Sequence, residues 1–448
     1  MSLLPLLASG SIPLLAVLPF VLLLLGIAVL PLVAHHWWES NRSRAIVSLG
    51  LALPVAGWLL VGPEHGAHWL AHSLVEYVAF LALLGSLFVI TGGIYLRGSL
   101  AGSPGVNTAI LAVGAVLASF IGTTGASMLL IRPLLRANER RERKTHIVVF
   151  FIFIVSNAGG MLTPLGDPPL FLGFLKGVPF AWTFGLAYEW AIVCSVLLAV
   201  FYAWDRAAMR REAPGASDPM GLREPLALEG KVNLLWLLGV IGVILGVGTL
   251  GSAWSDAAKA GVQAGGMLLF AVLSLRSTPQ AIRVANRFGY GPIVEVAVIF
   301  AGIFVTMVPA LHLLEGMGKD GTIALHHPWQ YFWATGALSS FLDNAPTYLV
   351  FASLAKGMLG IEADSLKALV DAGATATMPA GDILLKAISC GAVFMGANTY
   401  IGNGPNFMVK AIAEENKVKM PSFFGYMLWS VGILIPIFLV LTFVFFGN

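Results

Sequence analysis

The sequence predicts an all-α polytopic membrane protein with about ten membrane-crossing helices and two hairpins that enter the bilayer and return. First, 58% of its 448 residues are hydrophobic and only 11% are charged, against roughly 45–50% and about 25% in soluble domains. Second, apolar stretches long enough to cross about 30 Å of hydrocarbon recur from one end of the chain to the other. Third, the basic residues gather in a few connections between these stretches.

The same composition excludes several other classes of protein. Disordered, fibrous, coiled-coil and nucleic-acid-binding chains need far more polar or charged residues. The sequence carries no Ser/His/Asp, phosphate-loop or CxxC pattern, so we expect no enzyme activity, no bound cofactor and no ATP-driven pumping. Cys194 and Cys390 both lie inside apolar runs, which favours buried thiols that act as small hydrophobic groups.

The first predicted element is an apolar helix within residues 1–43. No Lys or Arg precedes its apolar run, and the run is too long for the core of a signal peptide, so we expect an uncleaved helix. Further crossings are expected near 44–63, 74–95, 147–178, 181–204, 232–250, 257–275, 292–314, 380–408 and 421–446. Two more apolar segments, 104–130 and 329–352, contain Gly, Asn, Asp or Pro near their middle and are interpreted as re-entrant hairpins.

Basic residues orient the predicted bundle. Lys and Arg in short loops resist translocation and therefore stay on the cytoplasmic side. The connections that carry them lie within 136–144, 206–231, 276–287 and 410–419. These connections reach the same side only if both hairpin segments return without crossing. The charge pattern thus supports the two hairpins and predicts a multi-pass protein of the cytoplasmic (inner) membrane.

A loop rich in Pro and Gly, at 205–231, separates two halves of the chain. It begins a linker and connecting helix, 205–256, between a first repeat at 44–204 and a second at 257–448. The motifs recur in order: Glu76 corresponds to Glu295, Thr123–Ser127 to Asp343–Thr347, and Thr163–Pro169 to Thr399–Pro405. Because the basic loops give the halves opposite orientations, we interpret them as an inverted repeat, which is typical of alternating-access transporters.

Two helices are expected to be discontinuous, one in 147–178 and one in 380–408. They contain Ser156–Pro169 and Ala397–Asn406, which are rich in Gly, Pro and Asn. In a helix interior Gly costs about 1 kcal/mol and Pro about 3 kcal/mol. Broken backbone at membrane depth is tolerated only where protein, water or a ligand satisfies it, and half-helix ends then form ion sites. A kink that serves packing or hinge motion is the alternative.

Four carboxylates of the predicted spans and hairpins are candidates for function, because an ionised side chain costs at least about 2.5–3.5 kcal/mol at the bilayer centre. Asp167 and Asp343 lie beside hydroxyl and amide oxygens, which are hard ligands suited to Na⁺. Each of them is alternatively a cap of a half-helix. Glu76 and Glu295 lie nearer the ends of their spans, where interfacial anchoring or a scaffold contact is equally expected.

Three histidines and a glutamate fall on one face of a predicted helix near its outer end: His65, His68, His72 and Glu76. We expect these side chains to be solvated at the membrane interface. A metal site or a pH sensor is the alternative.

At the motifs of the hairpins and breaks, the chain resembles the ion transporter superfamily, in the branch of arsenite permeases, citrate-type carriers and sodium/proton antiporters. The resemblance covers nearly the whole chain and rests on Asn157–Gly160, Thr163, Gly166–Pro169 and Ser340–Thr347. It implies a dimeric elevator-type secondary carrier with scaffold helices and a transport domain built from two hairpins and two broken helices. It further implies a site lined by Thr123, Thr124, Ser127, Asn157, Thr163, Asp167, Asp343, Asn344, Thr347, Asn398, Thr399 and Asn403.

The resulting expectation is a Na⁺/H⁺ antiporter in which Asp167 and Asp343 alternately bind Na⁺ and protons. The alternative is a Na⁺- or H⁺-coupled symporter of citrate or another organic anion, held by helix N-termini and by Asn, Thr and Ser groups. The proposed site contains no Lys or Arg, which favours cation exchange, although backbone amides also bind anions. A channel or receptor is disfavoured, because broken inverted repeats build one midplane site. The expected partners are the lipid bilayer, small inorganic ions or a small organic anion, and a second copy of the chain.

Overall fold

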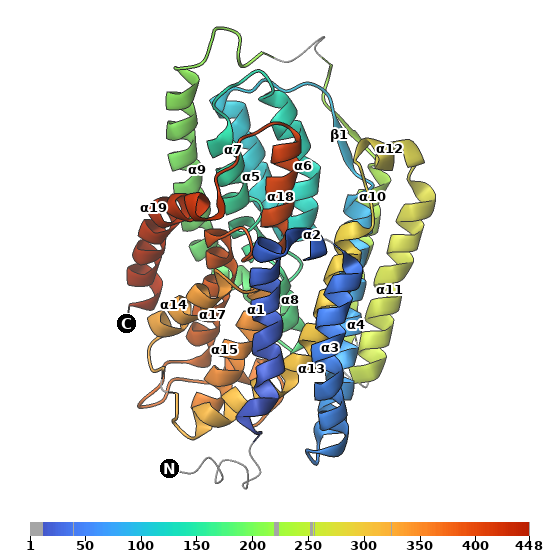
Figure 1. The fold of residues 1–448 in the computed structure, drawn as a ribbon, viewed down its shortest axis with the longest axis vertical. Coiled ribbons are helices and arrows are strands. Elements are labelled where there is room, and N and C mark those ends of the chain that lie inside the picture. Colours follow the sequence, from blue (N-terminus) through green and yellow to red (C-terminus); the bar gives the residue numbers. More distant parts are fainter. Residues whose placement is uncertain are drawn as a thin grey trace.

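The computed structural model describes residues 12–38, 40–218, 224–250, 254, 256–323 and 325–447. Residues 1–11 of the predicted first helix and 219–223 of the predicted linker lie outside the described residues. Within the described ranges the chain is a bundle of helices with one small sheet (Figure 1). In that sheet β1 (Tyr95–Arg97) pairs antiparallel with β2 (Ala227–Glu229). The predicted all-α class is confirmed.

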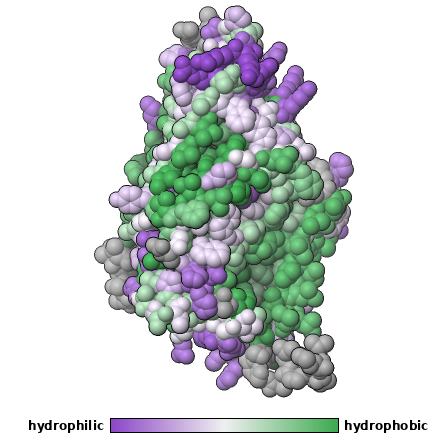
Figure 2. Space-filling model, turned by 90° about the vertical axis from the view of Figure 1, so that its left-hand side faces the viewer, coloured by the Kyte–Doolittle hydropathy of each residue, from purple (hydrophilic) through white to green (hydrophobic). Residues whose placement is uncertain are grey.

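Eight helices in the described part of the chain are long and apolar enough to cross a membrane. They correspond to α1 (Leu18–Val33), α3 (Asn41–Val61), α4 (Gly66–Thr91), α5 (Pro104–Ile121), α9 (Ala187–Met209), α11 (Asp256–Ser277), α13 (Gly291–Lys319) and α19 (Phe423–Leu441). Further helices are α10 (Val232–Leu250) and the short helices α2 (His35–Trp38), α12 (Gln280–Ala285) and α16 (Lys367–Asp371). Figure 2 shows hydrophilic residues gathered at the upper end and others near the lower end, with broad hydrophobic areas between them. The chain is a multi-pass membrane protein.

Two helix pairs occupy the predicted hairpin segments. α5 and α6 (Thr123–Ala137) pack against each other and are joined by Gly122 alone, whose φ of 79° suits the residue without a side chain. α14 (Pro328–Ser339) and α15 (Asn344–Met358) form the second pair. The second helix of each pair runs past the predicted ends at 130 and 352. The apolar sequence stops there, but the helix continues because the charged side chains that follow fit within it. Lys356, for example, is buried and pairs with Glu315 of α13.

Two further pieces of the chain are interrupted helices with the same layout. The first consists of α7 (Thr145–Ile154), η3 (Ala158–Met161) and α8 (Pro168–Leu175). The second consists of α17 (Gly381–Met395), η6 (Gly396–Asn398) and α18 (Gly404–Glu415). Asp167 and Asn403 precede α8 and α18 with nearly the same backbone conformation, φ −144° and ψ 144° against φ −152° and ψ 139°. In both cases a Pro follows at the start of the helix, where its missing N–H costs nothing.

The interrupted helices form the centre of the molecule. Every residue from His146 to Met161 is buried. Around this centre, α5 packs against α6, α9 and η3, and α14 and α15 pack against α17. A second group of helices lies beside them in Figure 1, where α13 packs against α3, α4 and α15, and α4 packs against α11. α8 touches both α4 and α15, so the second group borders the interrupted helices directly.

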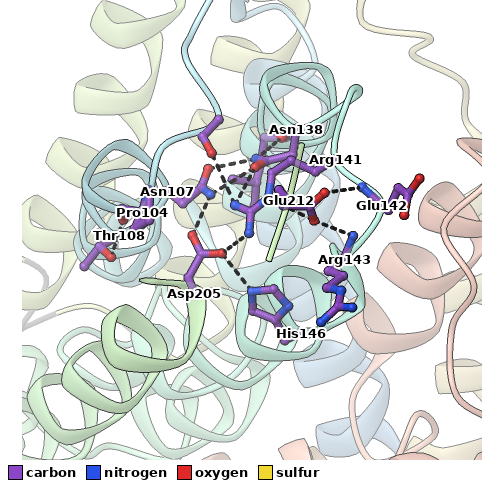
Figure 3. A network of polar contacts seen from close by, with 12 residues as sticks. Pro104, Asn107, Thr108, Asn138, Arg141, Glu142, Arg143, His146, Asp205 and Glu212 are labelled. Atoms are coloured by element: carbon purple, nitrogen blue, oxygen red, sulfur yellow. Dashed lines mark hydrogen bonds and ion pairs between the residues drawn. The ribbon is translucent and has the colours of Figure 1, made fainter. Parts of the chain in front are cut away.

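A buried polar cluster ties several helix ends together near one end of the bundle (Figure 3). Asp205 of α9 accepts hydrogen bonds from Arg141 Nη2 at 2.5 Å and from Asn107 Nδ2 at 2.9 Å. Its Oδ1 also lies 2.8 Å from His146 Nε2. Asn138 and Asn107 exchange two side-chain hydrogen bonds, at 3.0 and 2.8 Å. This Asp205 cluster joins the start of α5, the α6–α7 connection and the end of α9.

Candidate functional site

The carboxylate of Asp167 lies where both helix pairs and both interruptions meet. It is 1% exposed. Its Oδ1 accepts hydrogen bonds from Thr123 Oγ1 at 3.0 Å and from Asn403 Nδ2 at 3.1 Å. Its Oδ2 accepts one from Asn344 Nδ2 at 2.5 Å. Thr123 begins α6, Asn344 begins α15 and Asn403 precedes α18, so four segments far apart in the chain converge on one side chain.

A second row of amides supports these donors. Asn157, which directly precedes η3 in the first interruption, accepts a hydrogen bond from Asn403 Nδ2 at 3.2 Å and donates to Asn406 Oδ1 at 2.7 Å. Asn406 in turn donates to the backbone carbonyls of Gly396 and Thr399, at 2.9 and 3.0 Å. Asn406 was not among the predicted site residues, although it ends the Asn-rich segment that predicted the second interruption. These amides hold Asn403 toward Asp167.

Two predicted site residues, Thr163 and Thr399, bond to the helix pairs instead of to Asp167. Thr163 Oγ1 donates to the carbonyl of Ser119, and Thr399 Oγ1 donates to the carbonyl of Ser340. In return, Ser119 Oγ donates to the carbonyl of Gly159 at 2.5 Å, and Ser340 Oγ donates to that of Met395 at 3.2 Å. The same reciprocal contact therefore links each interruption to the first helix of a helix pair.

These matching contacts correct the predicted register between the two halves. Ser119 and Ser340 play the same part, and so do Thr123 and Asn344, which both donate to Asp167. Thr123 thus corresponds to Asn344, one residue beyond the predicted match with Asp343. Equivalent backbone roles decide the register: Asp343 corresponds to Gly122, since each is the residue before the second helix of its pair.

Asp343 has the geometry of a helix cap. Its Oδ1 accepts a hydrogen bond from Ala345 N at 3.0 Å, at the start of α15. Capping of this kind satisfies one of the free N–H groups of the first helical turn. Thr347 Oγ1 donates to the Asp343 carbonyl at 2.9 Å, so both predicted site residues bond within their own helix pair. The sequence left this capping role open as the alternative for Asp343.

The remaining predicted residues lie around the two interruptions. Ser127 Oγ lies 2.9 Å from Ser156 Oγ in the buried interior, and Thr124 is half-buried at the start of α6. Asn398 Nδ2 donates to Ser340 Oγ at 2.9 Å, while its buried Oδ1 has no hydrogen-bond partner among the described residues.

Glu76 and Glu295 are not hydrogen-bonded to Asp167. Glu76 lies 2.8 Å from Lys176 Nζ and 3.1 Å from His72 Nε2. Glu295 lies 3.1 Å from Arg44 Nη2. Among the described residues, no group of three or more His, Cys, Asp and Glu side chains is placed to hold a metal ion. His65, His68 and His72 therefore form no metal site within the described chain.

The arrangement around Asp167 is suited to binding a small cation or a proton. All three hydrogen-bond donors that the described residues bring to its carboxylate are neutral. An ionised carboxylate in this position is expensive at membrane depth unless a cation or a proton neutralises it. The hydroxyl of Thr123 and the amide groups of Asn344 and Asn403 also carry oxygen atoms of the kind that bind hard cations.

Comparison with known proteins identifies a matching protein family. A family model described as "Putative citrate transport" matches residues 9–446. The match spans both helix pairs and both interrupted helices. No curated protein matches the chain.

Proposed function

The chain belongs to this "Putative citrate transport" family and is a membrane transporter, and on this premise we propose that it exchanges Na⁺ for H⁺ at Asp167 by alternating access. The observation that carries the proposal is the buried Asp167 carboxylate, whose hydrogen-bond partners from three segments are all neutral. A carboxylate without a cationic side-chain partner is free to take its positive charge from Na⁺ or from a proton. The family membership confirms the resemblance that the sequence motifs indicated.

Exchange follows from competition at one group. Asp167 binds either Na⁺ or a proton, so one ion must leave before the other is bound. A site that crosses the bilayer only when it is occupied then couples the two ion gradients. Asp343 lies at the tip of the second helix pair beside Asn344, and we propose that its carboxylate supplies a further oxygen when Na⁺ is bound. Na⁺ and H⁺ are thus transported or coupling ions, and the proposal needs no other cofactor.

The second candidate function is symport of citrate or another organic anion with Na⁺ or H⁺. The family description favours it. α8 and α18 both begin beside Asp167, and the free N–H groups at helix N-termini bind carboxylates without Lys or Arg. In this mode Asp167 would hold the coupling cation while the helix ends hold the anion.

We further propose that the helix pairs and interrupted helices move together as a transport body against α3, α4, α10, α11 and α13. The ion pair between Glu76 of α4 and Lys176, which follows α8, and the pair between Glu315 of α13 and Lys356 of α15 join these two groups. A homodimer in the cytoplasmic membrane, with the second group as its interface, would hold this scaffold still. Cross-linking of single-cysteine variants on exposed α3 positions such as Leu53 tests this: dimer-specific products support it, and monomer alone contradicts it.

The test of the transport function uses purified protein in proteoliposomes with an imposed pH gradient. Na⁺, Li⁺, K⁺ and then citrate are added in turn, while the internal pH is followed. Collapse of the gradient by Na⁺ or Li⁺ alone supports antiport, whereas collapse only after citrate supports symport. Asp167→Asn should abolish either response, because the remaining amide carries no exchangeable charge.

The matched control is Asp364→Asn, at an exposed position of the chain. It should leave the response unchanged. Full activity of Asp167→Asn, or no response of the native protein to any of the four additions, would contradict the proposed function.

A further inference from the structure

A buried carboxylate outside the Asp167 site lacks a complete set of partners. Glu189 lies in the first turn of α9 and is 4% exposed. Its Oε2 is buried and accepts no hydrogen bond from any described residue. Acidic residues inside membrane-spanning segments are rare and, by default, indicate function. Glu189 was not identified from the sequence, because it lies outside the Gly- and Pro-rich motifs.

The charged neighbours of Glu189 come from the start of α17. Lys386 and Asp382 are the ionisable groups whose charges act on its carboxylate. Lys386 Nζ lies 3.1 Å from Asp382 Oδ2, and Trp182 Nε1 donates to Asp382 Oδ1 at 2.5 Å. Lys386 Nζ also lies 3.7 Å from the point where a side chain on Gly185 would begin, four residues before Glu189. The ammonium therefore pairs with Asp382 and also lies close to the turn that precedes Glu189.

Charge counting in this cluster leaves one negative charge unmatched. Glu189 and Asp382 are two carboxylates, and among the described residues Lys386 is the one ammonium whose charge acts on both. The other ionisable neighbour is the thiol of Cys390 on α17, which is buried. Lys386 is bonded to Asp382, so Glu189 is left without an ion pair to any residue that the structure describes. A proton on Glu189 neutralises the excess charge and makes its burial inexpensive.

Glu189 is also joined to both interrupted helices. Just before α9, Thr183 Oγ1 donates to the carbonyl of Leu162 at 3.0 Å, in the first interruption. α9 itself packs against η3. On the other side, α17 carries Lys386 and leads directly into the second interruption. Movement of either interrupted helix would therefore change the surroundings of Glu189.

From these contacts we propose that Glu189 is a second proton-binding residue of the transporter, in addition to Asp167. The proton is taken up while Lys386 is paired with Asp382. It is released when the Lys386 ammonium turns from Asp382 to the Glu189 carboxylate, and the unmatched negative charge then rests on Asp382, which is 34% exposed and accepts a hydrogen bond from Trp182 Nε1. This inference rests on the proposed proton-coupled transport and adds a residue that acts through the bound proton rather than through contact with Na⁺.

The competing explanation is that Glu189 only stabilises the N-terminus of α9. Acidic residues in a first helical turn interact favourably with the helix dipole. That role requires the carboxylate to stay ionised throughout the pH range of transport. Proton binding requires instead that the carboxylate be neutral over part of the pH range, so the two explanations differ in a spectroscopic signal.

The test is infrared difference spectroscopy of the full-length protein in lipid bilayers, titrated over pH. The carbonyl stretch of a protonated carboxylic acid lies apart from the protein amide band. We expect a titrating band of this kind that is lost in Glu189→Gln and retained in Asp167→Asn. The control is Glu362→Gln at an exposed position, which should leave the band unchanged. A band unchanged in Glu189→Gln would overturn the proposal.

A second variant covers the case in which Glu189→Gln does not fold. Lys386→Met removes the ammonium that stabilises the ionised carboxylate, so the band should titrate at higher pH than in the native protein. No shift in this variant would contradict the pairing of Lys386 with Glu189. Because the readout needs no transport, a correct infrared result without cation-driven H⁺ flux would refute Na⁺/H⁺ exchange and leave proton binding at Glu189 standing.

Discussion

Replacement of Asp205 by Asn tests the Asp205 cluster that joins α5, α6, α7 and α9. The side chains of Asp205 and Arg141 are both 0% exposed and 2.5 Å apart. Removal of one partner from a buried ion pair leaves the other charge without compensation, which typically costs 3–5 kcal/mol. Glu212 lies 4.0 Å from Arg141 Nε and compensates in part. We therefore expect Asp205→Asn to lower the free energy of unfolding by about 3 kcal/mol.

The measurement is equilibrium unfolding of the purified protein in detergent micelles, with helix content as the signal. The matched control is Asp371→Asn, which also breaks an ion pair, with Lys367 in α16. Both of those side chains are 58% exposed, and exposed pairs contribute roughly 0–1 kcal/mol. A loss for Asp205→Asn no larger than that of the control would refute the reasoning, because the Asp205 pair is buried and the control pair is exposed.

Three further predictions concern the site and its supports. Asn344→Ala removes a hydrogen bond to the Asp167 carboxylate, and such bonds to charged groups contribute about 1.5–3 kcal/mol. The apparent Na⁺ affinity, measured from Na⁺-dependent fluxes, should therefore be at least about tenfold weaker. An unchanged affinity would contradict the proposed site. A double-mutant cycle with Glu76→Gln and Lys176→Met should give a coupling energy of about 1–3 kcal/mol in unfolding measurements, because the two charged groups are 2.8 Å apart and mostly buried. A coupling energy near zero would show that the two groups do not interact. Gly122→Ala should lower the unfolding free energy by about 1–2 kcal/mol because its φ of 79° strains a residue with a side chain, whereas Gly50→Ala in open space on α3 should cause no loss.

Much of the fold could be predicted from local sequence, because membrane insertion and helix breaking depend on short segments. Apolar length alone identifies a helix that can cross hydrocarbon. Gly and Pro disfavour a helix wherever they occur, so the segments around Asp167 and Asn403 stand out within their spans. A single Gly at position 122 supports a sharp turn without any information about its neighbours.

Long-range contacts were harder to predict, and the clearest example is the pair of aspartates. Asp167 and Asp343 are both followed closely by Pro in similar motifs, yet Asp167 accepts hydrogen bonds from three distant side chains while Asp343 caps its own helix. The one-residue error in the register between the halves has the same origin. Short motifs align equally well at neighbouring offsets, and only the matching contacts of Ser119 and Ser340 distinguish them.

The sequence by itself determined that the chain is an all-α membrane protein, which helices contain Gly and Pro interruptions, and which family it resembles. Each of these depends on the composition or order of nearby residues, which solvent and backbone preferences decide locally. Only the tertiary structure decided that Asn406 supports Asn403, that Asp205 neutralises Arg141, and that Glu189 is buried beside Lys386. The partners of a buried polar group come from segments far apart in the chain, and packing alone brings them within hydrogen-bonding distance.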